Sequence, residues 1–136
     1  MKHVRDFKII SERICCLRLK AKRFSCTQMS LRQQTNKPKK KKNGRDKEEF
    51  YNLLEQNIKQ IARSDIKIIL GDFNAKVGKE SIYKPTIGNE SLHNETNNNG
   101  IKMIQFAISN GLNISTTFSR KDIHKETWYS AGQQTK

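Results

Sequence analysis

The sequence predicts an α/β fold, and three observations lead to this prediction. Apolar residues recur at helical spacing between Asp46 and Arg63. The aliphatic run from Ile66 to Leu70 follows closely and is typical of a short buried strand. A second helical pattern runs from about Asn99 or Gly100 to Ser109. Helices that alternate with strands indicate helices packed on a sheet.

Two short strands are expected ahead of the first helix, at residues 13–20 and 23–32, forming a β-hairpin over 13–32. Cys15, Leu17 and Leu19 alternate on one face of the first of these strands. A Lys-rich loop over residues 36–45 follows, and we expect it to be disordered because like charges repel and Pro and Gly break regular structure. Its candidate phosphate-binding residues, which also resemble a nuclear-localisation patch, are Lys39, Lys40, Lys41 and Lys42.

The first helix is expected to begin with Asp46 as its N-cap, paired with Glu49 at the third helical position. Glu55 and Lys59 stand in the favourable i,i+4 order. The stripe predicted to face the core is Phe50, Leu53, Leu54, Ile58 and Ile61.

The second helix is expected to turn Ile101, Ile104 and Ile108 inward and to end at Asn110-Gly111. Residues 112–115 and 126–130 are then interpreted as two further strands, the second of which contains the only tryptophan.

The net charge of +14 is concentrated in the first third of the chain. Residues 1–45 contain fifteen Lys and Arg against two acids, giving +13, and residues 46–136 contain twelve against eleven, giving +1. We therefore divide the chain into a basic N-terminal segment, 1–45, and a second part, 46–136. A basic segment attracts polyanions, and nucleic acid is the commonest of these inside a cell.

The sequence contains no run of apolar residues that could cross a membrane and no secretory signal, so a nuclear or cytoplasmic location is expected. The three cysteines, Cys15, Cys16 and Cys26, have no metal-ligand spacing. We expect them to be reduced and partly buried in strands.

The stretch Gly71-Asp72-Phe73-Asn74 follows the aliphatic run at residues 66–70, and reactive residues gather at the carboxyl ends of strands in α/β sheets. In extended geometry Asp72 and Asn74 would point the same way and Phe73 into the core. The carboxylate could then handle a water while the amide contacts a phosphoryl oxygen or a hard cation. A plain polar turn is the alternative.

A longer pattern resembles the endonuclease/exonuclease/phosphatase (DNase I-like) superfamily. Within it, the chain resembles the endonuclease domain of RTE/BovB-type non-LTR retrotransposons, a domain also called craniofacial development protein 2-like. The stretches that carry the resemblance are ILGDFNAKVG at 69–78, Asn97-Asn98-Asn99-Gly100, Phe106, Leu112-Asn113-Ile114, Phe118, Ile123-His124-Lys125 and Thr127-Trp128.

The resemblance implies part of a DNase I-like α/β sandwich and a Mg²⁺-dependent endonuclease that nicks DNA. It makes Asp72 the catalytic acid and gives Asn74 a contact with phosphate. It also makes Trp128 a residue of the DNA groove and places Asn99 in a structural turn.

The chain departs from this family at several catalytic positions. An expected Asn and a metal-binding Glu are absent ahead of residue 13, and an Asp and an Asp-His pair are absent by Lys136. Arg32 stands where the family has an aromatic ring or a histidine; its guanidinium can bind phosphate but cannot shuttle a proton. His93 and His124 match non-catalytic loop positions.

These departures predict a truncated, inactive remnant of such a domain, lacking its first strands and its C-terminal part and unable to hold Mg²⁺ stably. The alternatives are a fragment of a longer active endonuclease, a non-catalytic basic protein that binds nucleic acid, and a phosphatase of the same superfamily.

Overall fold

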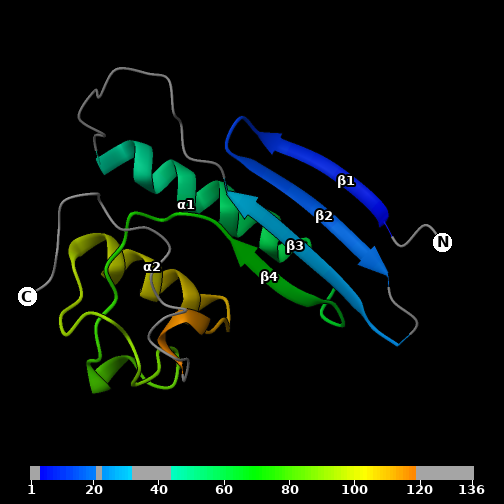
Figure 1. Ribbon diagram of the computed structural model, residues 1–136. Coiled ribbons are helices and arrows are strands. Elements are labelled where there is room, and N and C mark those ends of the chain that lie inside the picture. Colours follow the sequence, from blue (N-terminus) through cyan, green and yellow to red (C-terminus); the bar gives the residue numbers. More distant parts are fainter. Residues whose placement is uncertain (1–3, 21–22, 32–43, 119–136) are drawn as a thin grey trace, which may run out of the picture. The chain divides into compact units, whose positions relative to one another are not determined.

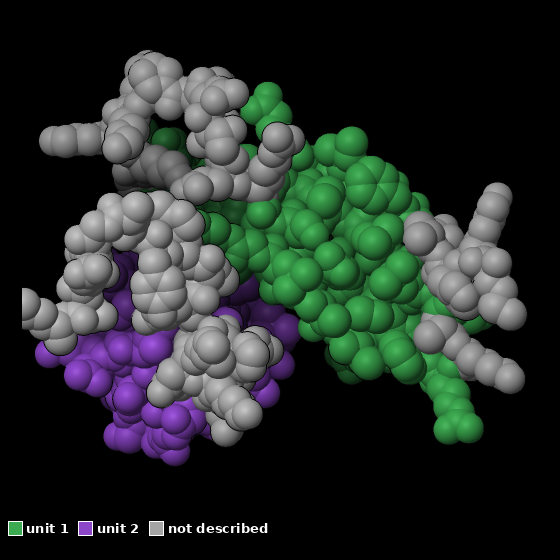
Figure 2. Space-filling view, in the orientation of Figure 1, with its two compact units in different colours: residues 1–73 green, residues 74–136 purple. Residues whose placement is uncertain are grey.

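The computed structural model describes residues 4–20, 23–31 and 44–118. The chain divides into two compact units, residues 1–73 and residues 74–136 (Figure 2). Each unit is described below by itself.

The first unit contains a mixed four-stranded sheet in the order β1-β2-β3-β4 (Figure 1). Its strands are β1 (Val4–Ser11), β2 (Ile14–Lys20), β3 (Ser25–Leu31) and β4 (Ile66–Leu70). The first three strands are antiparallel neighbours, and β4 joins β3 in parallel. Residues 1–45 therefore do not form a separate unit, because three of their strands share a sheet with β4.

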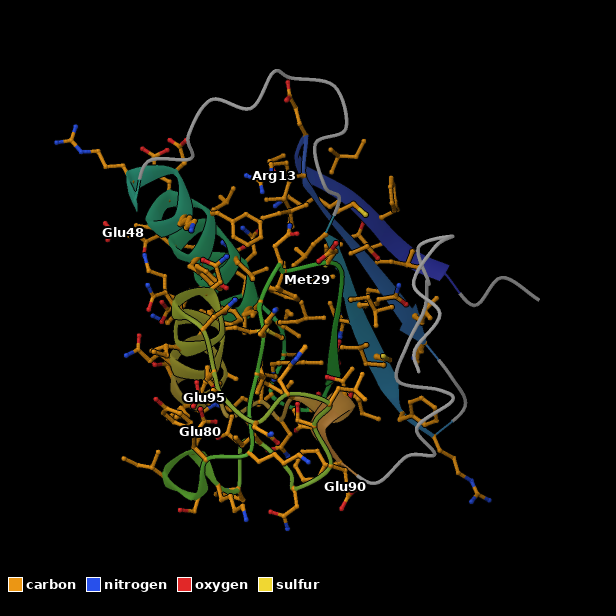
Figure 3. All side chains as sticks on the ribbon, turned by 60° about the vertical axis from the view of Figure 1, so that its left-hand side comes forward. Arg13, Met29, Glu48, Glu80, Glu90 and Glu95 are labelled. Carbon is orange, nitrogen blue, oxygen red and sulfur yellow. The ribbon has the colours of Figure 1, made fainter. Side chains whose placement is uncertain are left out.

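The helix α1 (Gly44–Lys59) provides the return connection from β3 to the parallel β4 and packs on one face of the sheet. Ile14 and Met29 from this face are fully buried, as is Leu54 from the helix, and Ile58 is buried beside them. Met29 lies between its strand and the helix (Figure 3). The predicted apolar stripe is confirmed for Leu54 and Ile58, but α1 ends at Lys59 instead of Arg63, so Ile61 lies beyond the helix. Lys59 and Glu55 form the expected ion pair at 2.9 Å.

Three expectations for the first unit were wrong or incomplete. The helix begins at Gly44, so Asp46 lies in its first turn and is not the N-cap, and residues 44 and 45 are helical. The strand β1 was not expected, although Phe7 and Ile9 alternate with Asp6 and Lys8 in the way strands do.

The third correction concerns β4, which was expected to be a short buried strand. Ile66, Ile68 and Leu70 are exposed. The strand lies at the edge of the sheet, and only the opposite face is covered by α1.

The second unit is built around the helix α2 (Asn98–Ser109), with two short 3₁₀ turns, η1 (Ser81–Tyr83) and η2 (Ser115–Thr117). The predicted C-terminus of α2 is confirmed, because Asn110 is the C-cap and Gly111 adopts a φ of +62°. The core of this unit consists of Val77, Ile87, Ile104, Ala107 and Ile114, with Tyr83, Met103 and Leu112 packed against it.

Two expectations for the second unit were wrong. Residues 112–115 form no strand; Ile114 donates one backbone bond to Thr86 and is buried in the core instead. Ile108 is exposed, because the buried face of α2 centres on Gly100, Ile104 and Ala107.

The expected strand at residues 126–130 and most of the Lys-rich loop lie outside the described residues. Among the residues that the structure does describe, no helix is long and apolar enough to cross a membrane.

Candidate functional site

The candidate site begins where β4 ends, and its position follows from the parallel pairing of β3 with β4. Ser30 pairs with Leu70, so the carboxyl ends of the two strands lie at the same edge of the sheet. Asp72 comes two residues after β4, and Arg32 is the residue that follows β3 in the sequence. Arg32 itself lies outside the described residues, so its side chain is not placed.

Gly71 lies directly against Leu31 at the end of β3, where there is no room for a side chain. A Cβ built at Gly71 would lie 2.5 Å from the Cβ of Leu31 and 3.0 Å from its carbonyl oxygen. No side chain fits at such distances. The glycine of the GDFN stretch is therefore explained by close approach of the backbone to the neighbouring strand.

Asp72 is exposed and ends the first unit together with the half-buried Phe73. Asn74 is exposed, begins the second unit and has a φ of +49°. A residue in this left-handed conformation is not extended, so the alternation that would aim Asp72 and Asn74 the same way does not reach Asn74. The assumption of extended geometry through Asn74 was therefore wrong, whereas the inward direction of Phe73, which is half-buried, stays a prediction.

In the second unit, the residues after Asp72-Phe73 are held against the start of α2. The carbonyl oxygen of Asn74 accepts a hydrogen bond from Nδ2 of Asn99 at 2.9 Å. Asn97 is the N-cap of α2; its Oδ1 accepts from the backbone N–H of Gly100 at 2.8 Å and from that of Lys76 at 3.1 Å. Its own N–H donates to the Lys76 carbonyl at 3.1 Å.

Gly100 completes this contact between the two stretches. A Cβ at Gly100 would lie 2.0 Å from the carbonyl oxygen of Lys76, so only glycine permits the helix to approach so closely. The structural role expected for Asn99 is also visible here, since its amide fixes the backbone of Asn74. Residues 69–78 and 97–100, which are separate stretches of the pattern on which the resemblance rests, thus meet through Asn74, Lys76 and the N-terminus of α2.

Glu80 organises the next part of the same loop and was missed in the sequence. Its carboxylate accepts hydrogen bonds from the backbone N–H and the hydroxyl of Thr96, both at 2.7 Å. The Thr96 hydroxyl oxygen in turn accepts from the N–H of Gly78 at 2.8 Å. Partial burial acts to raise the pKa of Glu80, but the hydrogen bonds from Thr96 and from backbone N–H groups outweigh it and leave that pKa lowered.

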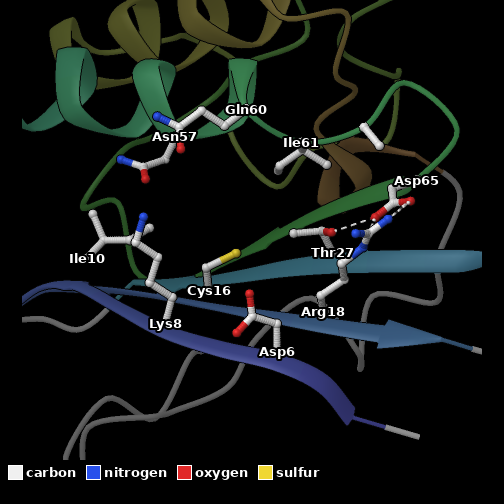
Figure 4. A pocket seen from close by; sticks show the side chains of 11 residues that line it. Asp6, Lys8, Ile10, Cys16, Arg18, Thr27, Asn57, Gln60, Ile61 and Asp65 are labelled. Atoms are coloured by element: carbon white, nitrogen blue, oxygen red, sulfur yellow. Dashed lines mark hydrogen bonds and ion pairs between the residues drawn. The ribbon is translucent and has the colours of Figure 1, made fainter.

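A second polar cluster lies in the first unit, between the sheet and the end of α1 (Figure 4). Asp65 is buried and accepts from Arg18 Nε at 2.8 Å, from Arg18 Nη2 at 3.0 Å and from the Thr27 hydroxyl at 2.9 Å. The hydrogen bonds from Arg18 are the main reason why the pKa of Asp65 is lowered. No local pattern in the sequence indicates this pair, which joins residues 47 positions apart.

An open pocket of about 220 Å³ adjoins this cluster and includes Cys16. Burial, together with the negative charge of Asp6, raises the pKa of the Cys16 thiol. A raised pKa keeps the thiol protonated, which does not suit a nucleophile. Cys15, Cys16 and Cys26 are unpaired and at least partly buried in strands, as expected.

The positions of most other candidate residues are not described. Trp128, Lys39, Lys40, Lys41 and Lys42 lie outside the described residues. His93 is exposed on a loop of the second unit, in line with the expectation of a surface residue.

The resemblance implies that Asp72 lies near a magnesium site. Mg²⁺ takes an octahedron of oxygen ligands that includes one or two carboxylates. Within residues 4–20, 23–31 and 44–118, no three His, Cys, Asp or Glu side chains gather in a way that could hold a metal ion.

Comparison of the chain with protein-family models, with curated proteins and with solved structures finds no match.

Proposed function

We propose that this chain is a remnant of a DNase I-like endonuclease domain of the retrotransposon type, one that keeps part of the scaffold of a phosphodiester-hydrolysing site without a working set of catalytic groups. In this proposal Asp72 occupies the position of the catalytic acid. Asn74 and the residues after it form the rim of the former active site. The substrate of the ancestral enzyme is DNA.

The observation that carries the proposal is the contact between residues 74–78 and the start of α2. The Asn97–Lys76 and Asn99–Asn74 hydrogen bonds and the close approach of Gly100 give physical reasons for the Asn and Gly residues at 97–100. They join two stretches that the resemblance names separately. The strand-turn geometry at Gly71 adds to this, because it leaves Asp72 exposed at a carboxyl edge of the sheet.

Loss of activity follows from the chemistry that hydrolysis needs. A general acid or base contributes about 10²–10⁴ in rate, and the family's proton carrier is replaced by Arg32, which stays protonated. A hard cation needs several oxygen ligands, whereas Asp72 supplies a single carboxylate. Without both groups, DNA cleavage falls to the uncatalysed background.

The test is a plasmid-nicking assay with the purified chain in Mg²⁺, run beside an active DNase as a positive control. We expect the wild-type chain and Asp72→Ala to leave supercoiled plasmid intact to the same extent. Asp46→Ala, which removes an exposed carboxylate on α1, is the matched control. Nicking by wild-type protein and by Asp46→Ala, with loss of nicking in Asp72→Ala, would show an active endonuclease and refute the proposed inactivity.

A second function, non-catalytic binding of nucleic acid, is favoured by the charge distribution. The +13 of residues 1–45 is enough to attract a phosphate backbone whether or not Asp72 takes part. Lys39, Lys40, Lys41 and Lys42 are the residues proposed to contact phosphate.

This function is tested by fluorescence anisotropy with a labelled duplex over a salt series. We expect log K to fall linearly with log salt concentration, and the slope to decrease by roughly three to four when Lys39 to Lys42 are all changed to Gln. Asp72→Ala should leave the affinity within about twofold of wild type because the charged segment, and not the acid, drives binding. An affinity that does not depend on salt would contradict this function.

A further inference from the structure

One face of the four-stranded sheet has several exposed apolar side chains among its described residues, and we call it the open face. It consists of the alternate ladder residues that point away from α1, and its exposed apolar members are Phe7, Ile9, Ile66, Ile68 and Leu70. Between them, β3 contributes two uncharged polar side chains to the same face, Gln28 and Ser30, which are hydrogen-bonded to each other at 3.1 Å. Leu17, which pairs with Phe7, lies at the centre of the face and is half-buried.

The open face differs in charge from the face that α1 covers. Asp6, Lys8, Arg18 and Lys67 all belong to the covered face, as the strand register requires. The described ladder positions of the open face contain no charged side chain, although the chain as a whole has 27 Lys and Arg. A sheet that has its charged side chains on one face and none on the described positions of the other usually packs that other face against a partner.

The exposed fractions show how much surface is involved. Ile9 is 71% exposed, Phe7 59%, Ile66 50%, Leu70 49% and Ile68 39%. Side chains of this size, about half uncovered, each leave on the order of 100 Å² accessible, which places the patch near the upper end for a monomeric protein, roughly 300–600 Å². Five such side chains give roughly 500 Å² per copy, or about 1,000 Å² for two copies, which is the lower limit for a specific interface.

The chemical character of the open face indicates what kind of surface it can bind. A nucleic acid offers phosphates, and the described ladder pairs of this face provide no cationic side chain to meet them. A surface of similar size that is equally apolar and uncharged is the match, and a second copy of this chain supplies one. Two such faces pack as sheets do in a sandwich, about 10 Å apart, with the strands nearly aligned.

We propose that two copies of this chain associate through their open faces in a symmetric dimer. A two-fold axis brings the same patch of each copy together, so no additional surface is required. The charged face of each sheet remains outside the interface. The proposal is independent of whether the chain cuts DNA.

Salt provides a test that separates this association from nucleic-acid binding. Each copy has a net charge of +14, so the two copies repel each other and salt screens that repulsion. We expect the dimer to tighten as salt increases, whereas binding to nucleic acid weakens.

The experiment is sedimentation-velocity centrifugation of the full chain over a concentration series at two salt concentrations. We expect a dimer in the wild type and at least a 100-fold higher dissociation constant in Ile9→Lys and in Ile68→Lys, because the new charge would be buried without a partner. Ile82→Lys is the matched control, since Ile82 is 81% exposed in the second unit, and it should leave the dimer intact.

Circular dichroism verifies that each variant is folded, and Ile9→Lys alters a side chain that is mostly exposed in the single copy. A wild-type chain that remains monomeric up to about 100 μM, well above a typical micromolar Kd, overturns the proposal. So does a dimer that resists both open-face variants, or one that Ile82→Lys dissociates equally well.

Discussion

Substitution of Asn97 tests which hydrogen bonds stabilise the second unit, because one side-chain oxygen of this residue accepts hydrogen bonds from two backbone N–H groups. Its Oδ1 accepts from the N–H of Gly100 and from that of Lys76. The change Asn97→Ala removes both hydrogen bonds and adds no bulk. It should therefore loosen both the start of α2 and the loop that follows Asn74.

The cost of Asn97→Ala can be worked out from these two bonds. Loss of an Asn N-cap costs about 1 kcal/mol. Loss of the bond to Lys76, at an exposed position, costs about 0.5–1 kcal/mol because water can replace part of it. For a unit of this size, about 1.5–2 kcal/mol lowers the melting temperature by roughly 6–16 °C.

The assay is thermal unfolding followed by far-ultraviolet circular dichroism, together with amide hydrogen exchange at Gly100 and Lys76. Both amides should exchange faster in Asn97→Ala. Asn97→Asp should restore the melting temperature, since a carboxylate oxygen accepts the same bonds and suits a helix N-terminus. The neighbouring Asn98→Ala, at an exposed helical position, is the matched control and should change little. Unchanged stability and exchange in Asn97→Ala would refute the reasoning.

Three further predictions follow from buried contacts. Leu54→Ala, which truncates a fully buried side chain between α1 and the sheet, should cost about 2–5 kcal/mol in chemical denaturation, and a cost below 1 kcal/mol would mean that α1 does not pack as described. Gly100→Ala places a methyl group 2.0 Å from the carbonyl oxygen of Lys76, and should destabilise the second unit by about 1–3 kcal/mol in thermal melts; a neutral result would exclude the close approach. The pKa of Asp65 is lowered by hydrogen bonds from Arg18, so its contribution is complete above the unfolded pKa near 4 and is lost as pH falls through the lowered value. Melting temperatures of wild-type protein should therefore fall more steeply than those of Asp65→Asn between about pH 4 and pH 2, and parallel curves would contradict the pairing.

Local patterns in the sequence were sufficient for much of the secondary structure. The periodic apolar residues of α1 and α2 predicted both helices, since a helix must turn one stripe toward a core. Ile14–Lys20 and Ser25–Leu31 pair as the antiparallel strands of the expected hairpin, because alternating residues on either side of a short break favour two strands. Asn110-Gly111 marked the end of α2 because glycine tolerates the left-handed backbone.

Boundaries and short apolar runs were less predictable. Asp46 has the right chemistry for an N-cap, but the helix starts two residues earlier, at Gly44. Residues 112–115 alternate like a strand, yet Ile114 is buried by packing in the core and not by a ladder. A run of three or four residues satisfies either arrangement, and only the neighbours in space decide between them.

The sequence by itself determined the α/β class, the helices, the hairpin, the concentration of charge before residue 46 and the Gly-Asp pair that follows a strand. Only the tertiary structure decided that β4 pairs in parallel with β3, that one sheet face is left open, that Asp65 meets Arg18 and that Asn97 holds Lys76. The physical reason is the range of the interactions. Periodicity, capping and turn preference act within a few residues, whereas strand pairing and buried hydrogen bonds join residues that are distant in sequence and form only when the chain has packed.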